Sequence, residues 1–335
     1  MADDEKKNDI NRRDFIKKGL KMAGALSITG LSAGLSGCYE FEDPIGGSSV
    51  WTGGGSTGAT KGFVAGGFSY LTRVEKYSDS TGSWSAVTGL NSGRHMLTSF
   101  SLGSDLGFTA GGYYGNVFEK YSDSVGTWST LTGSAARRAP GGFGLDIDSS
   151  IVGGGMFTGA LNTSEKYVDS TSTWSATGNL PLANSYMASM PIGTGVGIFA
   201  GGNYAPSATF RYSDSTGSWS YRAAALATAR SSSPLGFSLG TDLGFVAGGY
   251  NTGAPLNTAE KYSDSADSWT AIAGGMSYSR GWTSGFSLGS DYGFAVGGYP
   301  SLSSNTTEKY NNVTNSWTVS GTLTTGSKDH TCFSM

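Results

Sequence analysis

One ten-residue pattern occurs six times in this chain and constrains its fold more than any other feature. Residues 75–84 read EKYSDSTGSW, and related segments begin at residues 119, 165, 210, 260 and 308. In every copy a tryptophan follows a tyrosine at the seventh position. These pairs are Tyr77 and Trp84, Tyr121 and Trp128, Tyr167 and Trp174, Tyr212 and Trp219, Tyr262 and Trp269, and Tyr310 and Trp317. Because successive tryptophans are 44 to 50 residues apart, the sequence predicts an array of similar units with about four short strands each.

Each unit begins with an apolar strand that ends in two glycines. These segments are GFVAGG ending at Gly67, GFTAGG at Gly112, SIVGGG at Gly155, GIFAGG at Gly202, GFVAGG at Gly249 and GFAVGG at Gly298. Glycine weakens an isolated strand, so its recurrence predicts a close approach of a neighbouring unit. No helical spacing of apolar residues occurs beyond the first forty positions, and 12% of the residues are aromatic. The sequence therefore predicts an all-β fold with a packed core, and units of this length are typical of propeller blades.

A double glycine, a tyrosine and a tryptophan at these spacings resemble the kelch repeat. The resemblance covers about residues 60–335 and implies a six-bladed kelch-type β-propeller, with one four-stranded sheet for each repeat; we place this domain at residues 59–335. The segment TCFSM at 331–335 matches TSFSL at 98–102, which lies between two repeats. No such strand precedes the first repeat. We therefore expect the C-terminal strand to complete the first blade and close the ring.

The first 38 residues resemble an export signal with a lipid attachment site. Arg12 and Arg13 precede a Gly/Ala-rich apolar run over residues 20–35, and Cys38 follows Leu-Ser-Gly. The run is too short for a comfortable membrane span. The arginine pair is similar to a twin-arginine signal, and the segment ending at Cys38 is similar to a bacterial lipoprotein box. An ordinary amphipathic N-terminal helix is the alternative.

This resemblance implies that residues 1–38 are a signal peptide and that Cys38 becomes the acylated N-terminus. Twin-arginine export carries folded proteins, and the acyl chains would then anchor the domain to a bacterial membrane, on its periplasmic or cell-surface side. Residues 39–58, rich in Gly and Ser, read as a flexible tether. The chain has 22 Lys and Arg against 25 Asp and Glu, so binding of nucleic acid through a basic face is not expected.

Five basic residues near the start of the strand between repeats are the candidate binding residues. Arg94, Arg137 and Arg280 each lie six residues before an aligned phenylalanine, Arg230 lies seven before one, and Lys328 five before one. In kelch propellers this strand is the innermost, and arginines at its start bind acidic peptides or other anions in some members. The resemblance thus implies a cationic ring at the channel mouth that suits a carboxylate. Alternatively, these side chains cap strand ends or bind loop carbonyls.

A second set of basic residues occupies the position before each tyrosine, usually after a glutamate. We interpret this set as a solvated or inter-blade ion-pair surface; it consists of Lys76, Lys120, Lys166, Arg211, Lys261 and Lys309.

No motif for catalysis, metal binding or cofactor binding is evident. His95 and His330 lack further ligands at metal-site spacing, and the GSDLG-type segments read as hairpin turns. The leading interpretation is an exported, lipid-anchored binding or scaffold module for a protein or acidic glycan. One alternative is a periplasmic sugar or sugar-acid mutarotase or epimerase, because some six-bladed kelch proteins have that activity. A third is a structural cell-surface spacer.

Overall fold

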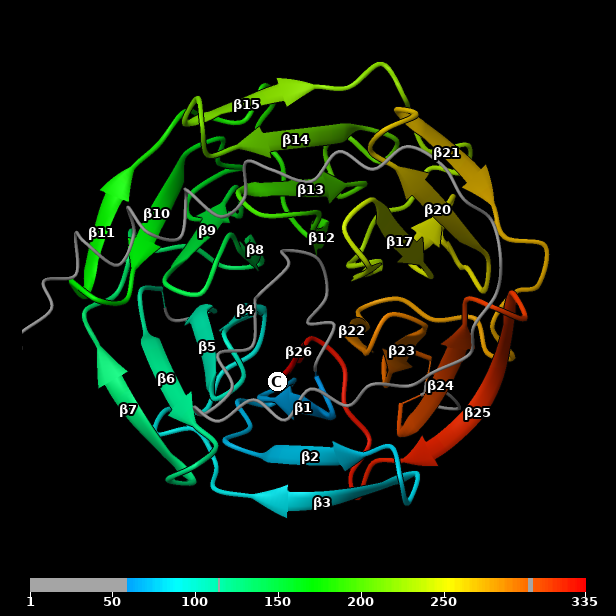
Figure 1. Ribbon diagram of the computed structural model, residues 1–335, viewed down its shortest axis with the longest axis horizontal. Helices are drawn as coiled ribbons and strands as arrows, with labels where there is room; N and C mark the ends of the chain where they lie inside the picture. The colour runs from blue at the N-terminus through cyan, green and yellow to red at the C-terminus, as the bar shows by residue number, and fades with distance from the viewer. Residues whose placement is uncertain (1–58, 114, 301–303) are drawn as a thin grey trace, which may run out of the picture. The chain divides into compact units, whose positions relative to one another are not determined.

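The computed structural model describes residues 59–335 except residues 114 and 301–303, and this part of the chain is built from β-strands. Six four-stranded antiparallel sheets surround a central axis as the blades of a propeller (Figure 1). The predicted six-bladed fold is confirmed. Within the described residues no helix is long and apolar enough to cross a membrane. Arg12, Arg13, Cys38 and the tether at 39–58 lie outside these residues.

The strands are given blade by blade, from the innermost outward. Blade 1 contains β26 (Thr331–Ser334), β1 (Lys61–Ala65), β2 (Val74–Ser78) and β3 (Ser83–Val87). Blade 2 contains β4 (Leu97–Leu102), β5 (Leu106–Gly111), β6 (Phe118–Ser122) and β7 (Thr127–Leu131). Blade 3 contains β8 (Gly141–Gly144), β9 (Ser149–Gly153), β10 (Ser164–Val168) and β11 (Thr173–Ala176).

Blade 4 contains β12 (Ala188–Pro191), β13 (Val196–Ala200), β14 (Thr209–Ser213) and β15 (Ser218–Tyr221). Blade 5 contains β16 (Leu235–Leu239), β17 (Leu243–Ala247), β20 (Ala259–Ser263) and β21 (Ser268–Ala271). Blade 6 contains β22 (Ser284–Leu288), β23 (Tyr292–Val296), β24 (Thr306–Asn311) and β25 (Ser316–Thr322). The short strands β18 (Tyr250–Asn251) and β19 (Ala254–Pro255) form a separate hairpin.

The C-terminal strand closes the ring, as predicted. β26 pairs with β1 in antiparallel register, with Phe333 opposite Phe63. The two phenylalanine rings stack with centroids 5.0 Å apart. The backbone nitrogen of Lys61 donates to the carbonyl of Met335 at 3.1 Å. Blade 1 is therefore assembled from the two ends of the described chain.

The repeated Tyr–Trp pair forms part of the core between blades. In every blade the two residues are direct cross-strand partners, as Tyr77 and Trp84 are in blade 1. The indole nitrogen of Trp84 donates to the hydroxyl of Thr307 in blade 6 at 2.8 Å. The constant spacing thus gives each blade an aromatic pair in the same register, and in blades 1 to 5 the indole N–H also donates across the blade boundary.

Glycine near the start of a blade's second strand makes room for a phenylalanine of the preceding blade. At Gly107 in β5, a Cβ atom would lie 2.1 Å from the ring of Phe333 in blade 1. At Gly62 in β1, it would lie 2.2 Å from the ring of Phe286 in blade 6. Any larger residue at these positions would force adjacent blades apart.

The basic residues before the tyrosines form ion pairs between blades. Lys76 of blade 1 contacts Asp123 of blade 2 at 2.7 Å, and Lys309 of blade 6 contacts Asp79 of blade 1 at the same distance. The other pairs of this kind are Lys120 with Asp169, Lys166 with Asp214, and Arg211 with Asp264. These aspartates belong to the repeated hairpin turns. The inter-blade interpretation of this surface is thus confirmed for five of the six positions.

Candidate functional site

The four predicted arginines are buried. Arg94, Arg137, Arg230 and Arg280 are at most 1% exposed and lie just before the innermost strands. In each case the Nη1 atom donates to two backbone carbonyls of the same blade. For Arg94 these carbonyls belong to Gly111 and Val117, both at 2.9 Å. The guanidinium therefore fixes the loop that follows the double glycine.

Each of these arginines also pairs with the glutamate that opens the repeated pattern in its own blade. The Nη2 atom of Arg94 lies 2.8 Å from Oε2 of Glu119. Glu119 is fully buried, and its Oε1 accepts a hydrogen bond from the backbone N–H of Ser92. Burial lowers the pKa of Arg94, and the charge of Glu119 opposes that shift. The equivalent pairs are Arg137 with Glu165, Arg230 with Glu260, and Arg280 with Glu308.

Two blades lack an arginine at this position. In one of them the glutamate is also absent, and in the other it pairs with a different arginine. In blade 4 the arginine is replaced by Asn184 and the glutamate by Phe210, so both charges are absent together. In blade 1 Glu75 is kept, but Ser327 occupies the arginine position. Arg73, which lies two residues before Glu75, supplies the cation instead, with Nη1 3.1 Å from Oε1 of Glu75. In each blade, therefore, the buried glutamate is present only together with an arginine that pairs with it.

Lys328 does not occupy the same position as the four arginines. The backbone N–H of Gly298 donates to the carbonyl of Ser327, as that of Gly67 donates to the carbonyl of Arg94. Lys328 therefore aligns with Arg138, one residue further along. The structure does not bring the five predicted residues together as one ring of exposed cations. That they bind a ligand stays a prediction, and the contacts described above match the alternative role of binding loop carbonyls.

Aromatic residues gather on the face where the inner strands begin. The residue after the double glycine is aromatic in four blades, as Phe68, Tyr113, Tyr250 and Tyr299. Other aromatic residues on the loops of this face include Tyr70, Phe157, Tyr204 and Trp282. We call these eight residues, with Lys328 and Arg138, the aromatic mouth. Phe157 is 62% exposed, Tyr204 56% and Phe68 52%, so much apolar surface lies open to solvent.

The two cations of the aromatic mouth lie against its rings. The Lys328 Nζ atom is 4.6 Å from the ring centroid of Phe68, 4.8 Å from that of Tyr299 and 5.5 Å from that of Trp282. The guanidinium carbon of Arg138 is 5.5 Å from the ring centroid of Tyr113. Contacts of this kind hold a cation over an aromatic face, and both Lys328 and Arg138 are partly exposed.

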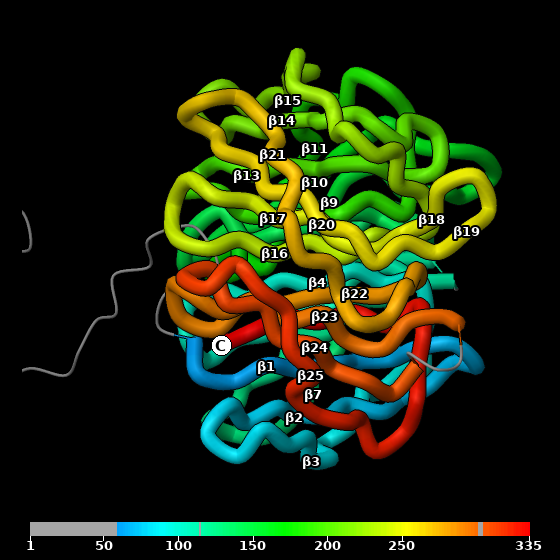
Figure 2. The backbone as a smooth tube through the Cα atoms, turned by 90° about the vertical axis from the view of Figure 1, so that its right-hand side faces the viewer, coloured from blue at the N-terminus to red at the C-terminus, as the bar shows by residue number. Residues whose placement is uncertain are grey.

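Charge separates the two faces of the propeller. Among the described residues, the loops around the aromatic mouth contain one acidic residue, Asp329. The hairpin turns of the opposite face carry the repeated aspartates, such as Asp105 and Asp242. In Figure 2 the C-terminal residue on the left marks the acidic face, and β18 and β19 on the right mark the face of the aromatic mouth. Five other hairpin aspartates are paired with Lys or Arg as described above, whereas Asp105 and Asp242 form no ion pair with a described residue, so this face disfavours an anionic ligand more than the mouth does.

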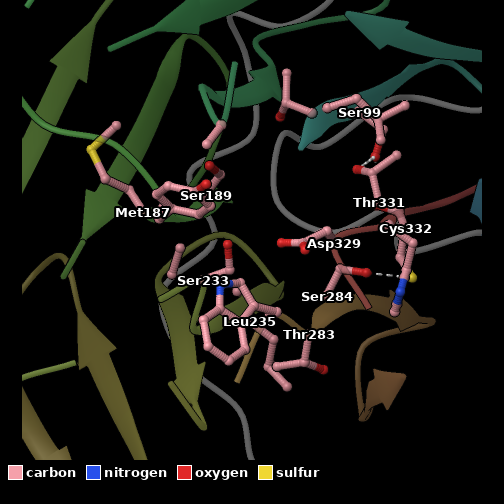
Figure 3. A pocket seen from close by; sticks show the side chains of 18 of the residues that line it. Ser99, Met187, Ser189, Ser233, Leu235, Thr283, Ser284, Asp329, Thr331 and Cys332 are labelled. Carbon is pink, nitrogen blue, oxygen red and sulfur yellow. Dashed lines mark hydrogen bonds between the residues drawn. The ribbon is translucent and has the colours of Figure 1, made fainter. Parts of the chain in front are cut away.

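A cavity of about 100 Å³ lies in the channel beneath the mouth (Figure 3). Backbone hydrogen bonds link the loops at its rim from blade to blade. Met96 donates to the carbonyl of Asp329 at 2.9 Å, Asp329 to that of Trp282 at 3.0 Å, and Trp282 to that of Ser232 at 2.8 Å. The rim residue has positive φ in all six blades; these residues are Met96, Ala139, Tyr186, Ser232, Trp282 and Asp329. Such strained backbone is found preferentially at functional sites.

The titratable groups of the cavity are held in their neutral forms, except Asp329. Burial lowers the pKa of His330 to about 3, and its Nε2 lies 3.1 Å from the carbonyl of Val296. Burial also raises the pKa of the Cys332 thiol to about 12, and Ser284 donates to its sulfur. Among the residues that the structure describes, no three His, Cys, Asp or Glu side chains are grouped to hold a metal ion.

Sequence reasoning missed both the glutamate partners of the arginines and the aromatic mouth. A signal for each was present. The residue six positions before Phe333 is Ser327, so alignment with the other repeats would have excluded Lys328 from the arginine position. In the repeat of blade 4, Asn184 replaces the arginine and Phe210 replaces the glutamate, and this joint change would have linked the two charged positions. The aromatic residues after the double glycines could have been aligned in the same way.

A model of the kelch motif matches residues 245–276. This segment runs from within β17 through β20 and β21 of blade 5 and includes the double glycine at 248–249, Tyr262 and Trp269. No curated protein matches the sequence significantly. The matched repeat has five counterparts in the same chain, and all six form blades of one propeller. Together these findings show a six-bladed β-propeller in which one blade matches the kelch motif and the other five repeat its pattern.

Proposed function

We propose that this protein is a binding module whose ligand surface is the aromatic mouth. The observation that carries the proposal is the concentration of exposed aromatic rings and two ring-bound cations on one face, while the other face is acidic. Aromatic residues and arginine are enriched at the centres of protein interfaces, and aspartate is depleted there. Kelch propellers commonly mediate protein binding, and this face has the composition for it.

The ligand that best fits the mouth is an acidic polypeptide segment with apolar side chains. Lys328 and Arg138 would pair with its carboxylates, and the rings of Phe68 and Tyr299 would cover its apolar groups. The predicted anion specificity is retained in this proposal, but it is assigned to the partly exposed Lys328 and Arg138 and not to the four buried arginines. An acidic glycan would share the charge and lack the large apolar groups.

A defined peptide tests the proposal. A short peptide of Glu, Leu and Phe should bind the isolated propeller, measured by fluorescence anisotropy, and binding should weaken as salt is raised. The same peptide with Gln in place of every Glu is the ligand control. The double variant Lys328→Ala with Arg138→Ala should weaken binding at least about tenfold. Lys261→Ala, a lysine on the outer part of blade 5, is the matched control and should leave the affinity unchanged.

Two outcomes would contradict the proposal. One is equal affinity for the Glu and Gln peptides, and the other is no effect of the double variant beside a correctly folded control. Binding of an anionic oligosaccharide in preference to the peptide would point to the glycan. Failure of all anionic ligands would favour the structural spacer.

We also propose that the module is exported and lipid-anchored, with residues 1–38 as its signal peptide and Cys38 as the acylated residue. The support is the order and spacing of Arg12, Arg13, the apolar run and Cys38 in the sequence. Metabolic labelling with palmitate in a bacterial host tests this proposal. Label should enter the wild-type protein and be lost in Cys38→Ala, and label that persists in the variant would refute it.

A further inference from the structure

Asp329 is the one carboxylate among the described residues that line the channel cavity, and no Lys or Arg lines it. Asp329 is 7% exposed, and its Oδ1 atom has no hydrogen-bond partner. In Figure 3 the carboxylate is directed toward the centre of the cavity. An unpaired carboxylate in such a place is costly, because burial removes its hydration without a compensating bond.

The neighbouring groups do not neutralise this carboxylate. Lys328 is adjacent in sequence, but its ammonium lies among the rings of Phe68, Tyr299 and Trp282. His330 is neutral, as described above. The Tyr186 hydroxyl lies 3.1 Å from the sulfur of Met96, and burial raises the pKa of Tyr186 to about 12. Burial likewise raises the pKa of Asp329 to about 6, with Lys328 opposing the shift.

The walls of the cavity are suited to a small organic cation. Trp282 and Tyr186 supply aromatic rings, and Met96, Ala139 and Pro140 supply apolar surface on part of the wall, while the remaining lining is rich in serine and threonine, whose hydroxyls can also accept from an ammonium group. Aromatic rings attract cations as well as covering alkyl groups. The volume of about 100 Å³ is several times the share of one water molecule, roughly 30 Å³, so a ligand of a few heavy atoms fits.

We propose that the channel cavity binds a primary alkylammonium ion, whose ammonium group donates to the carboxylate of Asp329 and whose alkyl chain lies against the apolar wall. This site is distinct from the acidic-peptide surface at the mouth, and the two ligands carry opposite charge. The cavity supplies the one unpaired carboxylate on a face otherwise free of acidic residues among those described. It would thus select a cation where the mouth selects an anion.

Propylammonium is the probe, and propanol is its neutral control. In NMR titrations of the full-length protein at pH 8, propylammonium should produce saturable shifts of the Asp329 carboxyl carbon and the Trp282 indole, while propanol should bind much more weakly. The Asp329→Asn variant should bind propylammonium about 10- to 100-fold more weakly. Asp291→Asn, on the opposite face, is the matched control and should bind as the wild type does.

A second measurement needs no variant. In the wild-type protein, propylammonium should lower the pKa of the Asp329 carboxyl, because it favours the ionised form, and propanol should not. Equal binding of the two probes, an unchanged affinity in Asp329→Asn, or an unchanged pKa would each overturn the proposal. Asp329→Asn should still bind the acidic peptide, so failure here is separable from failure of the mouth as a protein-binding surface.

Discussion

The buried Arg–Glu pairs allow a test that separates a structural role from a ligand-binding role. Replacing Arg94 by alanine would leave Glu119, which is fully buried, without its cation. It would also leave the carbonyls of Gly111 and Val117 without the donors described above. Breaking one partner of a buried ion pair costs about 3–5 kcal/mol. Because total stabilities are roughly 5–15 kcal/mol, this single change should remove a large part of the folding free energy.

Urea denaturation followed by tryptophan fluorescence measures the effect. Arg94→Ala should lower the free energy of unfolding by about 3–5 kcal/mol, and adding Arg280→Ala in blade 6 should roughly double the loss, since the two sites do not touch. Arg138→Ala is the matched control. Its side chain belongs to the partly exposed mouth, so the change should cost about 0–1 kcal/mol.

Blade 4 supplies a further control from the same chain. Copying its residues into blade 2, as Arg94→Asn with Glu119→Phe, removes both charges together and should cost less than the sum of the two single changes. If Arg94→Ala instead kept the wild-type urea midpoint and lost only the acidic peptide, the structural role argued for this arginine would be refuted.

Three further predictions concern Asp329, the ring closure and the inter-blade pairs. Burial raises the pKa of Asp329 in the folded protein to about 6, well above the ordinary value for an aspartate, so the native form holds the proton more tightly, and stability is lost as pH rises from about 4 to 6. Asp329→Asn should therefore stabilise the protein by on the order of 3 kcal/mol at pH 8 and have no effect at pH 3, measured by urea denaturation at both values; equal effects would contradict the shift. Deleting residues 328–335 removes β26 and should abolish the cooperative thermal transition, and a truncated protein with the wild-type melting temperature would disprove closure by this strand. Lys309→Ala breaks a partly exposed pair with Asp79 and should lower the free energy of unfolding by no more than about 1 kcal/mol, measured by urea denaturation, so a larger loss would show that this pair is essential to closure.

The fold could be predicted from the sequence because its determinants repeat. The constant step from Tyr77 to Trp84 and its five copies reflects one cross-strand register, so the alignment alone defines a blade. The match of TCFSM to TSFSL identified the strand that completes blade 1. A pattern that recurs in every repeat reflects a packing requirement that all the blades share.

The candidate site was harder to predict because it depends on which groups the ends of the side chains contact in the folded protein. Arg94 and Glu119 are 25 residues apart, and only the folded blade shows that they pair. A basic residue at a strand start looks the same in sequence whether its charge faces solvent or a buried carboxylate. The unpaired state of Asp329 is likewise a property of the assembled channel, since its wall comes from several blades.

The pairing of β26 with β1 also has a topological consequence. Residues 61 and 335 are hydrogen-bonded neighbours, so a short linker could join them without disturbing either strand. The chain could then be cut at an exposed hairpin turn such as the one at residues 240–242, and every sheet would keep its four strands. The order of blades around the axis is thus independent of which residue comes first, and circular permutation is open to this molecule.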